Sequence, residues 1–62
     1  MNNYQYALSK IMRADTVEAL GRVETLLSQL YDSGFLTVNQ LSRLDYVLVD
    51  HSIALEEEGL LA

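Results

Sequence analysis

Apolar side chains recur every three or four residues in three stretches, which is the spacing of one face of a helix. This pattern predicts helices near residues 3–13, 16–32 and 38–58. The first segment places its apolar stripe at Tyr4, Leu8 and Ile11. The middle segment has its seam at Leu20, Val23, Leu27 and Leu30, widened by Ala19, Leu26 and Tyr31. The last segment has a matching seam at Leu41, Leu44, Leu48, His51 and Leu55, with Val47 and Ala54 beside it.

Capping signals mark the ends of the two longer helices. The stretch from Asp15 to Glu18 has a capping-box pattern, in which an oxygen-bearing side chain precedes a Glu by three residues. Thr37 and Gln40 repeat this pattern before the last helix. Gly34 and Gly59 are placed to end helices in the left-handed conformation.

The loop between the second and third helices is short, which favours an antiparallel helical hairpin. We therefore predict an all-α fold, in which a short N-terminal helix packs across this hairpin. Residues 1–62 should form one small helical domain. Leu27 and Leu48 are expected at the centre of the hairpin.

The last helix carries a second apolar stripe, formed by Tyr46, Val49 and Ile53. At about 100° per residue, this stripe lies well over a right angle from the inner seam. A single hairpin cannot cover both stripes. Two alternatives remain open: the first helix covers the second stripe, or another protein chain does.

Asp50 and His51 lie in the middle of this otherwise apolar helix. His51 lies on the inner seam, which suggests a core histidine with one ring nitrogen hydrogen-bonded and the other packed. Asp50 lies beside the second apolar stripe. Adjacent helical residues point about 100° apart, so the pair is a poor catalytic dyad. The chain also has no Cys, no second His and no Gly-rich phosphate loop, so we expect no enzymatic activity and no catalytic residues.

The amino-acid composition limits which cofactors and binding partners the chain can have. Without Cys and with one His, the chain has neither disulfides nor the ligands of a structural zinc site, and no cofactor is expected. The formal charge of −5 argues against strong direct nucleic-acid binding. It favours a protein partner with a basic surface, or serves only solubility. Lys10, Arg13 and Arg22 could form a small basic patch, or pair with Glu18 or Glu24. No apolar run reaches the roughly 18 residues that span a bilayer, so no membrane segment is expected.

The motifs resemble the Hha/YmoA family of small bacterial expression modulators, as a divergent or truncated member. The shared features are Tyr4 and Tyr6 in the first helix, Met12-Arg13, and the run from Thr16 to Val23. Leu36-Thr37 opens the long helix in the same way. The most specific feature is the constellation Tyr46-x-x-x-Asp50-His51-x-x-Ala54.

The resemblance implies a non-enzymatic modulator of transcription that binds the dimerisation domain of an H-NS-like nucleoid protein. It implies a bacterial cytoplasmic protein that associates with the nucleoid through that partner. By resemblance, Asp50 and Glu18 belong to an acidic face that meets arginines of the partner. The candidate binding residues are therefore Asp50, Glu18, Tyr46, Val49 and Ile53. Two other functions stay open: a self-associating helical-bundle regulator, dimeric and of plasmid or phage type, and an acidic protein-binding inhibitor.

Overall fold

The computed structural model describes residues 2–60, and it begins with helix α1, Asn3–Arg13. Asn2 caps this helix: its side chain accepts a hydrogen bond from the Gln5 amide at 2.8 Å, and the Gln5 side chain accepts one from the Asn2 amide at 3.4 Å. This capping box satisfies amides that have no partner within the helix. Lys10 and Arg13 lie in the last turn, where cations complement the helix dipole.

Helix α2, Val17–Asp32, begins one residue later than the Asp15 capping signal indicates. The predicted cap at Asp15 is wrong. Thr16 has the extended cap conformation, and its hydroxyl accepts a hydrogen bond from the Ala19 amide at 3.0 Å. Ala19, three residues after the cap, has no side-chain acceptor, so no reciprocal bond forms at this end.

Helix α3, Val38–Glu57, begins at the predicted capping box. The Thr37 hydroxyl accepts from the Gln40 amide at 3.1 Å, and the Gln40 side chain accepts from the Thr37 amide at 3.0 Å. Before it, Gly34 has a φ of 81°, and the Phe35 amide donates to the Leu30 carbonyl. These features define the left-handed helix end that was predicted there, and Gly59, with a φ of 76°, ends α3 in the same way.

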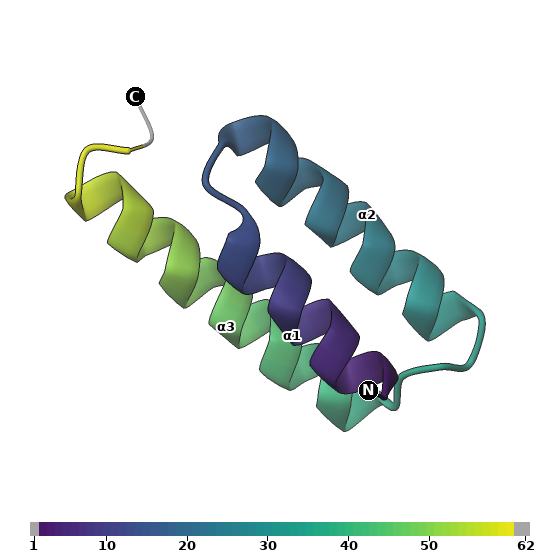
Figure 1. Cartoon of the computed structure of the whole chain (residues 1–62). Coiled ribbons are helices and arrows are strands. Elements are labelled where there is room, and N and C mark those ends of the chain that lie inside the picture. Colours follow the sequence, from purple (N-terminus) through teal and green to yellow (C-terminus); the bar gives the residue numbers. More distant parts are fainter. Residues whose placement is uncertain (1, 61–62) are drawn as a thin grey trace.

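The three helices form an up-down-up bundle (Figure 1). Helix α2 runs antiparallel to α3, as the hairpin prediction requires, and α1 lies alongside both of them. The predicted all-α fold is therefore confirmed. The short first helix fills the groove of the hairpin and closes the core on its third side.

One apolar cluster forms the core among the described residues. Ile11, Leu27 and Leu44 are its largest completely buried side chains, one from each helix. The predicted inner seams supply most of the cluster. Two small buried residues were not predicted: Ala7 within α1, and Ala14, which caps the end of that helix. Their size lets the α1 backbone approach its neighbours closely. Two predictions at the edge of the seams are wrong, because Tyr31 and Ala54 are exposed.

Candidate functional site

His51 of α3 forms a long-range hydrogen bond inside the bundle. Its Nε2 lies 2.7 Å from the backbone oxygen of Ala14, which is buried at the end of α1. A carbonyl oxygen can only accept, so Nε2 carries the hydrogen and donates it. The predicted hydrogen bond from one ring nitrogen of His51 is confirmed, but the ring is half-buried at the edge of the core rather than enclosed in it. The bond ties α3 to the connection between α1 and α2.

His51→Ala should lower the free energy of unfolding by about 0.5–1.5 kcal/mol, because it removes the hydrogen bond that the half-buried His51 ring donates to the Ala14 carbonyl. Urea denaturation followed by far-UV circular dichroism measures this change. Ser52→Ala is the matched control, because the Ser52 hydroxyl donates only to Val49 of its own helix. His51→Gln, whose amide can still donate, should lose less than His51→Ala. Equal stability of the His51→Ala variant and the wild type would contradict the structural role of this bond.

The second apolar stripe of α3 remains open to solvent. Tyr46, Val49 and Ile53 are 75%, 57% and 49% exposed. The alternative in which the first helix covers this stripe is therefore wrong. Helix α1 instead turns its own stripe, centred on the fully buried Ile11, toward the inner seams of α2 and α3. That placement buries more apolar surface, because two helices enclose α1 there instead of one.

Asp50 lies on this open surface of α3, four residues after Tyr46 and three before Ile53. These are the spacings of neighbours on one helix face. Its carboxylate is exposed, as are Arg43 two turns earlier and Glu57 two turns later on the same side. We call Tyr46, Val49, Asp50 and Ile53 the α3 surface. It combines an apolar stripe with one carboxylate, and the edge on which Asp50 lies continues to a cation, Arg43, at one end and an acid, Glu57, at the other.

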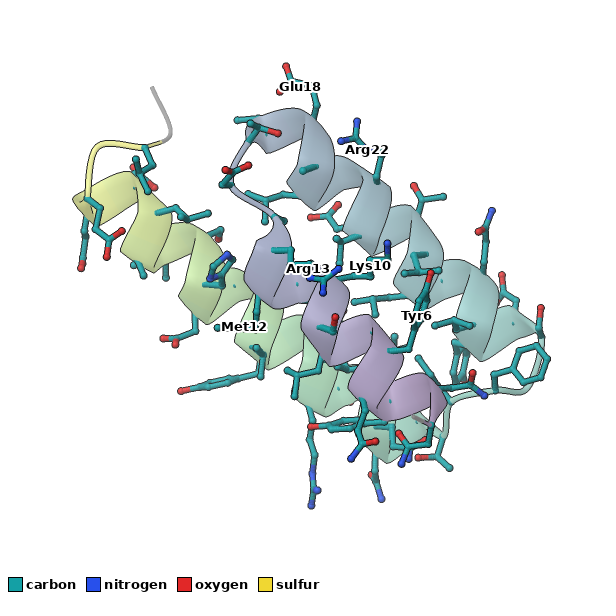
Figure 2. The ribbon with its side chains drawn as sticks, in the orientation of Figure 1. Tyr6, Lys10, Met12, Arg13, Glu18 and Arg22 are labelled. Atoms are coloured by element: carbon teal, nitrogen blue, oxygen red, sulfur yellow. The ribbon has the colours of Figure 1, made fainter. Side chains whose placement is uncertain are left out.

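Glu18 lies apart from this surface. It is in the first turn of α2, and Figure 2 shows it at the outer end of that helix, pointing away from α1 and α3. The structure thus brings together four of the five candidate binding residues, Asp50, Tyr46, Val49 and Ile53, and leaves Glu18 on another helix. A partner that touched both Asp50 and Glu18 would have to extend around the bundle.

Three basic side chains gather between α1 and α2. Lys10, Arg13 and Arg22 all line a groove between α1 and α2, and the Lys10 ammonium lies 5.5 Å from the centre of the Tyr6 ring. The small basic patch suggested by the sequence is thus present. The groove itself was not predicted, because it depends on how closely the two helices pack. Met12, 58% exposed, is another apolar surface residue that the helical patterns did not single out.

A metal site and a membrane-spanning helix are both absent from the part of the chain that the structure describes. No three His, Cys, Asp or Glu side chains within residues 2–60 come close enough together to hold a metal ion. None of the helices in this part of the chain combines the length and the apolar character needed to cross a bilayer. The α3 surface itself presents apolar side chains and one exposed carboxylate that can meet a cationic group.

No protein-family model matches the sequence, and comparisons with curated proteins and with solved structures also give no match.

Proposed function

We propose that this chain is a non-enzymatic adaptor that binds another protein through the α3 surface. The observation that carries the proposal is the open stripe of Tyr46, Val49 and Ile53 on a helix whose inner face already serves the core. These side chains span about 10 Å of helix. Positions i, i+3 and i+7 of one helix face are the spacing at which amphipathic helices place the anchors that dock into a partner.

Asp50 determines the kind of partner. A protein that covers Tyr46 and Ile53 also removes water from the carboxylate between them, and a desolvated carboxylate requires a charged hydrogen-bonding partner. An arginine suits this position, because its guanidinium can bind both carboxylate oxygens and so orient the partner. The partner should therefore present an apolar helix face with an arginine beside it.

The sequence resemblance supplies the first partner to test, the dimerisation domain of an H-NS-like nucleoid protein. Of the shared constellation, Tyr46 and Asp50 are exposed, whereas His51 is bonded to Ala14 within the bundle. In this proposal the first two residues contact the partner and His51 holds α3 in place. The adaptor would then modulate transcription in the bacterial cytoplasm, reaching the nucleoid through its partner.

Titration calorimetry of the chain against such a domain tests this function. Asp50→Asn should weaken binding by about 2–5 kcal/mol, which is roughly 30-fold or more, because it leaves the partner's arginine buried without a counter-charge. Ile53→Asp should abolish binding, and both variants should keep the wild-type helix content because both residues are exposed. The wild-type affinity should also fall as the salt concentration rises.

Asp45→Asn is the matched control, because Asp45 is an exposed acid of α3 about 140° around the helix from Asp50. It removes the same charge and should leave the affinity within about twofold of the wild type. Equal losses for Asp45→Asn and Asp50→Asn would mean that only net charge matters. No heat with the wild type, or unchanged affinity for Asp50→Asn, would reject the adaptor function with this partner.

A second function, self-association as a helical-bundle regulator, is favoured by the charges along the same edge. In an antiparallel pair of α3 helices centred between Val49 and Asp50, each Tyr46 lies opposite the second copy's Ile53. Arg43 then lies within one residue of the level of the second copy's Glu57, which is on the same edge, so the pairing is self-complementary. Sedimentation equilibrium of the chain alone separates the two functions. A monomer favours the adaptor, whereas a dimer that Ile53→Asp dissociates favours the bundle.

A further inference from the structure

The groove between α1 and α2 has a volume of about 340 Å³, at the small end of the roughly 300–1,000 Å³ range of small-molecule sites. Its apolar lining comes from both helices and the residue that ends α1: Ala14, Ala19, Val23 and Leu26. Lys10 and Arg13 from α1 and Arg22 from α2 supply the charged part (Figure 2). The groove therefore combines an apolar floor with cationic groups, and it is separate from the α3 surface.

The charge of the groove is opposite to that of the chain. Three of the four Lys and Arg residues line it, although the formal net charge is −5. The described lining residues include no acid to neutralise them. Separate structural roles exist: Lys10 and Arg13 complement the α1 dipole, and Arg22 follows Glu18 by one helical turn. Those roles act within single helices, and they do not require cations of α1 and α2 to line the same groove.

The chemistry of the three cations points to a carboxylate. A guanidinium presents paired N–H donors that match the two oxygens of a carboxylate, and Arg13 and Arg22 approach the groove from different helices. Lys10 adds a point charge, held 5.5 Å from the Tyr6 ring centre. A polyanion such as nucleic acid is disfavoured, since only three cations face it and the rest of the chain is acidic.

We propose that this groove binds a small amphiphilic carboxylate, such as a medium-chain aliphatic acid. Its carboxylate lies with Arg13 and Arg22, and its hydrocarbon covers Val23 and Leu26. Both parts of the ligand are needed, because the apolar floor contributes burial and the arginines contribute charge-assisted hydrogen bonds. The proposal does not depend on the partner of the α3 surface, because no residue is shared between the two sites.

NMR titration of the isotopically labelled full chain with octanoate tests the site. The amide signals of the groove residues Ala14, Ala19, Val23 and Leu26 should shift and saturate, with half-saturation on the order of 1 mM for a ligand of this size. Octanol, which has a similar apolar body without the charge, should bind at least about tenfold more weakly. Acetate, which has the charge without the body, should produce no saturable shifts.

Matched variants distinguish binding at the groove from a nonspecific effect of the chain's charge. Arg13→Gln combined with Arg22→Gln should weaken octanoate binding about tenfold or more, whereas Arg43→Gln, an exposed cation of α3, should change it less than about twofold. Arg13 and Arg22 are exposed, so the double variant should keep its helix content. Should the double variant unfold, the wild-type shifts and the octanol comparison still decide the question.

Several results would overturn the proposal: octanoate shifts that fail to saturate or that map outside the groove, equal binding of octanol, or an equal effect of Arg43→Gln. An acidic leucine-containing peptide provides the last comparison. If the peptide shifts the groove amides and octanoate does not, the groove is a protein-docking site and the small-molecule proposal is wrong.

Discussion

Leu27→Ala should lower the free energy of unfolding by about 2–5 kcal/mol. The Leu27 side chain is 1% exposed and lies in the core cluster with Leu44 and Ile11, so its removal leaves a cavity among all three helices. A domain of 62 residues has a total stability of roughly 3–9 kcal/mol at typical values per residue. This single truncation should therefore remove a large part of the stability and unfold a measurable fraction of the molecules.

Urea denaturation followed by far-UV circular dichroism measures the change in stability of Leu27→Ala. The matched control is Leu60→Ala, which deletes the same atoms from a side chain that is 58% exposed. The control should denature within about 0.5 kcal/mol of the wild type. Leu48→Ala, the other position predicted at the centre of the hairpin, should behave like Leu27→Ala because Leu48 is also buried. A Leu27→Ala variant that denatures together with the wild type would show that Leu27 does not lie in the core.

Ile11→Ala should have an effect of similar size, about 2–5 kcal/mol, although it lies in the shortest helix. Ile11 is completely buried, because α1 lies against both α2 and α3. An isolated helix of this length is marginal in water, so α1 depends on this docking for its own stability. We therefore expect α1 to unfold in the same transition as the hairpin.

Two probes of the Ile11→Ala variant test this cooperativity. Circular dichroism follows all three helices, and hydrogen exchange of individual amides follows α1 separately. Both should report the same loss of stability. Met12→Ala is the control, because Met12 is the next residue along α1 and is 58% exposed. Loss of protection in α1 alone, with α2 and α3 unchanged, would show that α1 is attached to the hairpin without being part of its cooperative unit.

The helices and their ends were largely predictable because their determinants are local. The Thr37–Gln40 capping box and the left-handed Gly34 act within a few residues, so the sequence near each end contains the necessary information. The misplaced cap of α2 shows how narrow this information is. Asp15 and Thr16 are both good caps by residue type, and the structure uses Thr16.

The α3 surface was partly predictable. Helical spacing alone placed Tyr46, Val49 and Ile53 on one face, with Asp50 beside them. Spacing could not decide whether α1 would cover that face. The single apolar stripe of α1 could pack either on that face or against the inner seams of α2 and α3. The decision came from packing: the groove between α2 and α3 buries α1 on two sides.

The amino-acid sequence by itself determined the three helices, the inner seams and the apolar face of α3, because these depend on neighbours one to four residues apart. Only the tertiary structure decided which groups meet across the chain. His51 bonds to Ala14, 37 residues away, and cations from α1 and α2 line one groove. The physical reason is that a helical pattern specifies which side of each helix is apolar. The partner of each side depends on how all three helices pack at once.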